Sequence, residues 1–548
     1  MRIALSQLNF IIGNFEYNFN KIEDSINKAK AVETDLLVFS ELAICGYPPH
    51  DLLEQKLFVE KCRHWIEKVA AICDNIAVII GGPSLNPNQQ GKILYNTAFF
   101  IAEKTIQSLH HKALLPTYDI FDEYRYFEPG TDFKVADYKG EKIAITICED
   151  LWDDPPVETA FGRSRLYNVS PIEELIVQKP DFVINIAASP FSYTKSKIKQ
   201  NIFTAHAAKH NLPLFYVNQV GAHTDLIFDG GSMVIDANGN IADSLNLFEE
   251  DLRFYESENL KQKSGLSINK PEINKIHDAL VMGVRDYFYK TGLKTAILGL
   301  SGGIDSAVTL VIAVEALGNK NVRVMLLPSK YSSNHSVDDA MKLARNLDVQ
   351  FDITNIQPSV NAVLEAVQPT FSGYKEDITE ENIQARIRGV LLMALSNKFR
   401  NILLNTSNKS EIAVGYGTLY GDMNGGLSVI GDVYKTDVYR LANFINLDKE
   451  IIPANILSKP PSAELRFDQK DTDSLPEYDV LDSILYRYIE QQKSSNDIMN
   501  EGFDPALVSK IIRMVNFNEY KRFQTPPILR ISSKAFGLGR KMPIVGKY

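Results

Sequence analysis

The chain has 548 residues. A single hydrophobic core rarely organises so many residues, so about two to four domains are expected. A formal charge of −10 argues against non-specific nucleic-acid binding, and no apolar stretch of about 18 residues predicts a membrane span, so small molecules are the expected partners. The spacing of the four cysteines indicates neither a disulfide framework nor zinc, which favours a reducing, cytoplasmic location.

Residues 1 to about 250 alternate short β-rich runs with helical stretches. RIALSQLNF precedes an amphipathic segment near Asn18 to Glu33, and DLLVFSE precedes a further helix and the run NIAVIIGG. The later runs TAFFIA, KIAITICED, DFVINIAAS and LPLFYVNQVG each end where a polar residue first appears. This pattern predicts a layered α/β domain whose ligand site lies at the strand ends.

Three of these strand ends carry the residue types that nucleophilic amide chemistry requires. Glu41 follows DLLVFS, Lys112 lies in LHHKALLP, and Cys148 follows KIAITI. Each has an ordinary alternative, since a Glu caps helices, a Lys is usually solvated and a Cys usually packs in a core. Together they supply a base, a cation for the oxyanion and a thiol nucleophile.

The segments around these residues, FSELAICGYPPHDLL, HHKALLPTYDIFDEYRYFEPG and ITICEDLWDD, resemble the nitrilase, or carbon–nitrogen hydrolase, superfamily. The resemblance implies an αββα layered domain over residues 1–250 that hydrolyses glutamine. It implies Glu41 as general base, Lys112 as transition-state stabiliser and Cys148 as the nucleophile that forms a thioester. The residues implied to hold glutamine or support the site are Glu123, Tyr118, Ser189 and Lys195.

Two further segments complete this half. The stretch Gly221 to Asp225, GAHTD, departs from the family pattern, and we expect His223 to be a surface hydrogen-bonding residue. The polar residues 251–272 lack sustained alternation and end near a proline, so they are predicted to be the interdomain linker.

Residues 273–548 again alternate helices with strands, which predicts a parallel sheet covered on both faces. Its first strand runs into a turn, AILGLSGGIDSAVTL, between Ala296 and Leu310. Two glycines let a phosphate approach backbone N–H groups, and Asp305 is suited to a metal beside that phosphate. Two glycines alone fit an ordinary strand-to-helix turn equally well, and the segment is neither a Walker A loop nor GxGxxG.

The string SGGIDS resembles the loop of ATP enzymes that release pyrophosphate. Downstream, NTSNKSEIAVGYGTLYGDMNGG and GDVYKTDVY resemble the NAD synthetase family, the glutamine-dependent members of which carry a nitrilase domain. The resemblance implies a Rossmann-like α/β domain, with ATP as a substrate and Mg²⁺ as the cofactor. The residues implied to bind ATP are Gly299, Ser301, Gly302, Gly303, Asp305, Ser306 and Thr406; those implied to bind the nicotinate dinucleotide are Arg386, Asp422 and Lys435; and those implied to bind the metal are Asp305 and Glu411.

Where the family pattern has Thr-Thr-Gly-Asn, this chain has Asn405 and Ser407 in place of Thr and Gly, so a contact at Ser407 is not carried over. After Asp448 a Pro- and Asp-rich segment is longer than most structureless loops, which predicts either a lid or a docking arm.

The combined resemblances imply that glutamine hydrolysis supplies ammonia, that ATP adenylates nicotinic acid adenine dinucleotide, and that ammonia displaces AMP to form NAD. An enclosed ammonia passage and a homo-oligomer are expected. Two alternatives stay open: the same glutaminase coupled to another adenylated acceptor, and a non-catalytic nucleotide-binding scaffold.

Overall fold

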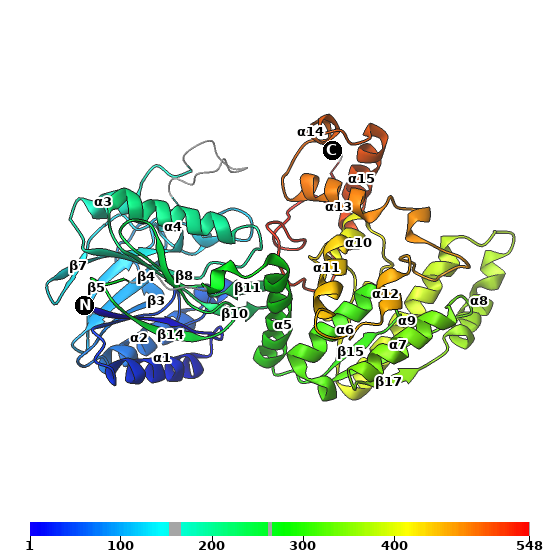
Figure 1. Ribbon diagram of the computed structural model, residues 1–548, viewed down its shortest axis with the longest axis horizontal. Coiled ribbons are helices and arrows are strands. Elements are labelled where there is room, and N and C mark those ends of the chain that lie inside the picture. Colours follow the sequence, from blue (N-terminus) through cyan, green and yellow to red (C-terminus); the bar gives the residue numbers. More distant parts are fainter. Residues whose placement is uncertain (153–165, 261–265, 547–548) are drawn as a thin grey trace. The chain divides into compact units, whose positions relative to one another are not determined.

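The computed structural model describes residues 1–152, 166–260 and 266–546. The chain divides into two compact units, residues 1–270 and 271–548 (Figure 1). Within the described residues, no helix is long and apolar enough to cross a membrane.

The first unit is built on two six-stranded sheets that pack face to face. One sheet has the strand order β14-β1-β2-β3-β4-β5 and the other has the order β13-β12-β9-β8-β7-β6, while β10 and β11 form a separate hairpin. The strands are β1 (Arg2–Gln7), β2 (Leu36–Val38), β3 (Ala77–Leu85), β4 (Leu94–Ala102), β5 (Thr105–His111), β6 (Ala136–Tyr138), β7 (Glu141–Ile147), β8 (Phe182–Ala187), β9 (Leu214–Asn218), β10 (Val220–His223), β11 (Leu226–Asp229), β12 (Met233–Ile235), β13 (Ile241–Ser244) and β14 (Asp251–Glu256).

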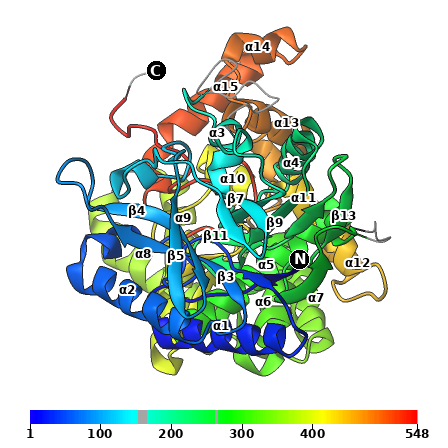
Figure 2. The ribbon, with the colours of Figure 1, turned by 90° about the vertical axis from the view of Figure 1, so that its left-hand side faces the viewer.

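Helices cover the outer faces of this sheet pair. α1 and α2 lie along one side and α3 and α4 along the other, which gives the expected αββα layers (Figures 1 and 2). Their bounds are α1 (Phe15–Lys30), α2 (Lys56–Ala71), α3 (Pro171–Ile176) and α4 (Ser196–His210). In α1, Ile22, Ile26 and Ala29 are buried at helical spacing, so one apolar stripe holds the helix on its sheet.

Two expectations are corrected in this unit. Residues 251–256, predicted to belong to an irregular linker, form strand β14, which pairs antiparallel with β1 from Arg2↔Glu256 to Gln7↔Asp251. The ladder supplies backbone hydrogen bonds that the sequence pattern does not display. His223, expected at the surface, is buried at the end of β10.

The second unit has one parallel five-stranded sheet in the order β17-β16-β15-β18-β19. The strands are β15 (Ala296–Gly299), β16 (Val322–Leu326), β17 (Gln350–Ile353), β18 (Ile402–Asn405) and β19 (Leu427–Ser428). The chain moves outward on one side of β15 and then returns to its other side with β18. The carboxyl ends of β15 and β18 therefore form the switch point where such sheets bind ligands.

Helices surround this sheet and continue into a helical region at the end of the chain (Figure 1). They are α5 (Glu272–Thr291), α6 (Ile304–Leu317), α7 (Asn334–Asn346), α8 (Gln357–Phe371), α9 (Ile378–Phe399), α10 (Lys409–Val414), α11 (Lys435–Ile445), α12 (Ala454–Ser458), α13 (Tyr478–Ile489), α14 (Ser495–Asn500), α15 (Pro505–Phe517) and α16 (Glu519–Arg522). A separate apolar core joins α10 to α13, α14 and α15.

Candidate active sites

Glu41 and Lys112 form a buried ion pair in the first unit. Lys112 Nζ lies 2.8 Å from Glu41 Oε1 and 2.8 Å from Glu123 Oε2, and both Lys112 and Glu41 have no exposed surface. Asn96 Nδ2 donates to Glu41 Oε1 at 2.7 Å, and the backbone N–H of Ala188 donates to Glu41 Oε2 at 2.9 Å. Three donors thus fix the orientation of the carboxylate that the sequence predicts to be the base.

The charges of Glu41, Lys112 and Glu123 set the protonation states of this cluster and of Cys148. Burial alone would lower the pKa of Lys112, but Glu123 and Glu41 raise it well above its usual range, so the ammonium form persists. Burial raises the pKa of Glu123 to about 7, with Lys112 opposing the shift and Glu41 adding to it. Burial and the charge of Glu41 also raise the pKa of Cys148, so the resting group is a thiol that a base must deprotonate.

Cys148 stands at the turn that ends β7. Its φ of 44° places it in the left-handed region, which a side chain adopts only under constraint. The constraint comes from Asp150, whose Oδ2 accepts from Ile147 N at 2.9 Å and whose Oδ1 accepts from Ala113 N and Leu114 N. Asp150 therefore links, through hydrogen bonds, the turn that carries Cys148 to the segment that follows Lys112.

Glu149, the neighbour of Cys148, is a buried acid that sequence reasoning missed. Its Oε1 accepts from Tyr118 Oη at 2.7 Å and from Tyr167 Oη at 2.9 Å. Of the residues predicted to hold glutamine, Lys195 lies 3.8 Å from Asp119 and its charge acts on Glu149. The backbone N–H of Ser189 donates to Asn218. The only signal for Glu149 in the sequence is its place directly after Cys148, the predicted nucleophile.

The phosphate-type turn of the second unit follows β15 as predicted. Ser301 Oγ accepts from Gly303 N at 3.1 Å and lies 3.1 Å from Ser306 Oγ. Gly302 has a φ of +76°, and a Cβ at this position would lie 2.2 Å from the carbonyl oxygen of Ser336. Only glycine fits here without movement of the backbone.

Beside this turn, three charged side chains meet. Lys435 Nζ lies 2.5 Å from Asp305 Oδ2 and 3.5 Å from Glu411 Oε1. Asn408 Nδ2 donates to Asp305 Oδ1 at 2.8 Å. Burial and the neighbouring Asp305 raise the pKa of Glu411 to about 8, while Lys435 opposes the shift. Two such carboxylates suit a hard cation completed by other oxygen ligands, although the described residues contain no group of three His, Cys, Asp or Glu side chains placed to hold a metal.

A pocket of about 310 Å³ opens over these groups. Its lining includes most of the predicted nucleotide and metal residues, namely Gly299, Ser301, Gly303, Asp305, Ser306, Thr406, Glu411, Asp422 and Lys435. Gly302 and Arg386 are not among the described residues that line it. Arg386 is exposed and donates to the carbonyl of Leu419, whereas Arg388, two residues further along α9, lines the pocket.

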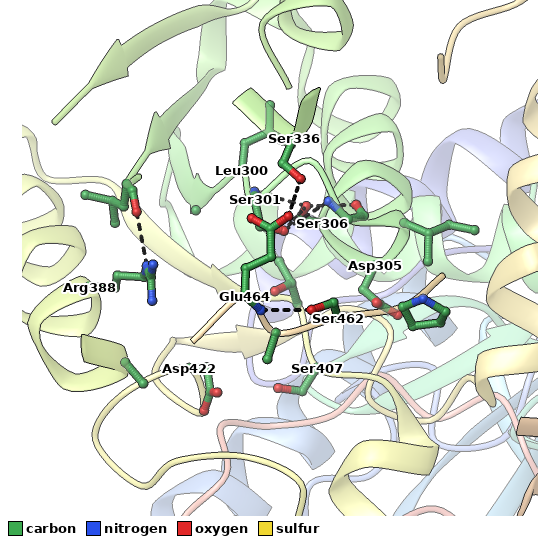
Figure 3. Close-up of a pocket in the computed structure, with 18 of the residues that line it drawn as sticks. Leu300, Ser301, Asp305, Ser306, Ser336, Arg388, Ser407, Asp422, Ser462 and Glu464 are labelled. Atoms are coloured by element: carbon green, nitrogen blue, oxygen red, sulfur yellow. Dashed lines mark hydrogen bonds between the residues drawn. The ribbon is translucent and has the colours of Figure 1, made fainter. Parts of the chain in front are cut away.

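The Pro-rich segment from Lys459 to Asp471 also contributes to the lining of this pocket. Glu464 Oε1 accepts from Ser336 Oγ at 2.6 Å and from Ser333 Oγ at 3.0 Å, at the start of α7. Figure 3 shows Glu464 directed at Ser336, close to Ser301. The segment after Asp448 therefore forms part of the wall of this pocket.

The comparisons with known proteins agree with this division. The carbon-nitrogen hydrolase family matches residues 2–257, and the NAD synthase family matches residues 276–525. The chain is 46% identical to the glutamine-dependent NAD(+) synthetase of Synechocystis, covering 99% of this chain and 98% of that protein. It is 39% identical to the Thermotoga maritima synthetase, covering 100% and 99%. The solved glutamine-dependent NAD+ synthetase of Acinetobacter baumannii, in complex with ADP, is 38% identical with a TM-score of 0.78, covering 99% of this chain and 98% of that chain.

Fold and sites together define a nitrilase-type amidase joined to an ATP-using enzyme with a parallel sheet. The two family matches lie on the two structural units in the same order. With 46% identity over 99% of its length, the chain belongs to the family of glutamine-dependent NAD(+) synthetases.

Proposed function

We propose that this protein forms NAD from nicotinic acid adenine dinucleotide, ATP and glutamine. The observation that carries the proposal is that one chain holds both a buried Glu41–Lys112 pair beside Cys148 and a Lys435 cluster beside a phosphate-type turn. The acceptor is supported by similarity to glutamine-dependent NAD(+) synthetases over nearly the whole chain.

In the first site, Glu41 takes the proton of Cys148 as the sulfur attacks the glutamine amide carbon. Lys112, kept charged by two carboxylates, stabilises the oxyanion that forms. Ammonia leaves with a proton returned from Glu41, and water then hydrolyses the thioester to glutamate. Glu149, with Tyr118 and Tyr167 on one oxygen, offers an anionic partner for the substrate's ammonium group. Lys195 and Ser189 are proposed partners for its carboxylate.

In the second site, ATP phosphates lie against the turn Ser301 to Ser306, at the N-terminus of α6. Asp305 and Glu411 would hold Mg²⁺, since they place two carboxylates side by side next to the phosphate-type turn. When bound, Mg²⁺ neutralises charge that develops on the phosphates. Lys435 supplies a second cation at the same place. Thr406 is a proposed ATP contact and Asp422 a proposed dinucleotide contact, and both line the pocket.

The nicotinate carboxylate of the dinucleotide attacks the α phosphate of ATP, the bond between the α and β phosphates breaks, and pyrophosphate leaves. Ammonia then attacks the adenylated carboxyl carbon and AMP departs. Free ammonia is mostly protonated near neutral pH and its conjugate acid cannot attack, so protected transfer between the two sites is part of the proposal. Arg386 is retained as a proposed dinucleotide contact, with Arg388 as the arginine that lines the pocket.

A homo-oligomer is also proposed, on the evidence of the α8–α9 surface. Within α8, which the structure describes in full, only Val360 is buried, and on α9 the large apolar residues Ile378, Val390 and Phe399 are exposed. Exposed apolar side chains along α9 favour an interface between copies. Val390→Glu should lower the mass measured by light scattering, and an unchanged mass would exclude this surface. The proposed location is the cytoplasm, in keeping with four free cysteines.

An assay with glutamine or ammonium as nitrogen source tests the function. Product NAD, AMP and pyrophosphate are measured with nicotinic acid adenine dinucleotide as acceptor. NAD formation from both sources supports the proposal. Glutamine hydrolysis and pyrophosphate release only with a different carboxylate would favour the alternative acceptor, and ATP binding without turnover would favour the scaffold.

A further inference from the structure

Asp482 is a buried carboxylate on α13 that lies outside the described pocket lining yet links two elements of the proposed ATP site. Its Oδ1 accepts from the hydroxyl of Ser410, and its Oδ2 accepts from the backbone N–H of Thr436 at 2.9 Å. Ser410 Oγ in turn accepts from the backbone N–H of Lys435 at 2.9 Å. Asp482 thus receives hydrogen bonds from α10 and from α11 at once.

These bonds replace the cap that α11 lacks. Lys435 and Thr436 are its first two residues, and their N–H groups have no acceptor within the helix. The side chain of the N-cap residue Tyr434 makes no capping hydrogen bond. Ser410 and Asp482 together satisfy both donors, and the carboxylate favours the positive end of the helix.

The same bonds set the position of the reacting groups. Ser410 directly precedes Glu411 on α10, and Lys435 begins α11, so Asp482 fixes the two helices from which Glu411 and Lys435 extend. Lys435 Nζ reaches Asp305 and Glu411 from that helix start. A shift of α11 relative to α10 would change both of these distances together.

We propose that Asp482 is a positioning residue for the adenylation site, which holds Lys435 at its working distance from Asp305 and Glu411 through Ser410 and the first turn of α11. The inference rests on the proposed function of that site. Asp482 is not among the described residues that line the pocket, so its effect passes through the two helices.

Asp482→Asn tests this with little change of shape. One carboxylate oxygen, which accepts hydrogen bonds, becomes an NH₂ group, which only donates them. This donor then faces either the N–H donor of Thr436 or the hydroxyl donor of Ser410, and that hydrogen bond is lost. A displacement on the order of 1 Å at a reacting group costs about 100-fold in rate, so kcat for NAD formation from ammonium should fall about 10- to 100-fold. The Mg²⁺ concentration for half-maximal activity should rise, while glutamine hydrolysis without ATP stays unchanged.

Asp479→Asn is the matched control, because Asp479 is exposed on the same helix. Ser410→Ala breaks the same link and should lower kcat similarly, and the double variant should be no slower than the slower single variant. Equal kcat for Asp482→Asn and Asp479→Asn, or additive losses in the double variant, would overturn the inference. If Asp482→Asn does not fold, Ser410→Ala decides: normal kcat overturns the proposal. Absence of NAD formation in the unmodified protein would instead refute the proposed function.

Discussion

Replacing Gly302 with alanine should disable the ATP site while leaving the glutaminase intact. Gly302 has a φ of +76°, and its missing Cβ would stand 2.2 Å from the Ser336 carbonyl oxygen and 2.9 Å from its carbonyl carbon. Both the backbone conformation and the space at this position require glycine.

The loss of folding free energy expected for Gly302→Ala has two parts. Holding an alanine in the left-handed region costs about 1–2 kcal/mol. Ordinary contact begins near 3.4 Å, so the Cβ overlaps the start of α7 by more than 1 Å and the turn must move. Overpacking of this kind adds about 1–3 kcal/mol, which gives a total of about 2–5 kcal/mol.

Gly292 offers a matched control, because it has a φ of +74° and a Cβ added there would meet nothing within 4 Å. Gly292→Ala should therefore cost only the backbone part, about 1–2 kcal/mol, and leave turnover unchanged. Urea unfolding and ammonium-dependent NAD formation are measured for both variants. We expect Gly302→Ala to lose about 100-fold in kcat/KM for ATP. Equal stability and equal kcat/KM for the two variants would refute the reasoning.

Three further predictions concern the two sites. Cys148→Ala should abolish NAD formation from glutamine and preserve it from ammonium, and loss of both in a folded variant would contradict separate sites. Asp305→Asn should slow formation from either source about 100-fold, since it removes a partner of Lys435 and of the proposed Mg²⁺; unchanged turnover would exclude Asp305. The kcat/KM of glutamine hydrolysis should fall as the pH drops through about 7, because Glu123 becomes protonated and its charge no longer balances that of Lys112. Glu123→Gln should lack this pH dependence. If this variant still loses activity with falling pH as the unmodified protein does, Glu123 is not the group that titrates.

The sequence predicts the parts of the fold that local patterns encode. Glu41 and Cys148 follow apolar runs and Lys112 directly follows a strand, and strand ends collect ligands, so their meeting is foreseeable. A turn between strand and helix is equally clear, because Gly302 and Gly303 separate an apolar run from a helical one. Its assignment to phosphate rests on the resemblance of SGGIDS, since two glycines alone also fit an ordinary turn.

The remaining features depend on tertiary contacts. β14 alternates polar and apolar residues only from Asp251 to Phe254, too short a run to stand out in the polar stretch that follows, and it is fixed by pairing with β1. On α9 the apolar residues are distributed around the helix, so the sequence does not indicate that Arg388 rather than Arg386 lines the pocket. Glu464 and Asp482 reach partners more than 40 residues away along the chain, at Ser336 and Ser410. The periodicity of a local sequence segment does not predict hydrogen bonds to such distant residues.

The stoichiometry of products in one reaction tests the central claim most directly. With glutamine, ATP and nicotinic acid adenine dinucleotide, the account predicts that NAD, AMP and pyrophosphate form in equal amounts, with glutamate at least equal to NAD. Formation of ADP and phosphate in place of AMP and pyrophosphate would contradict the assignment of the turn between Ser301 and Ser306 as a pyrophosphate site.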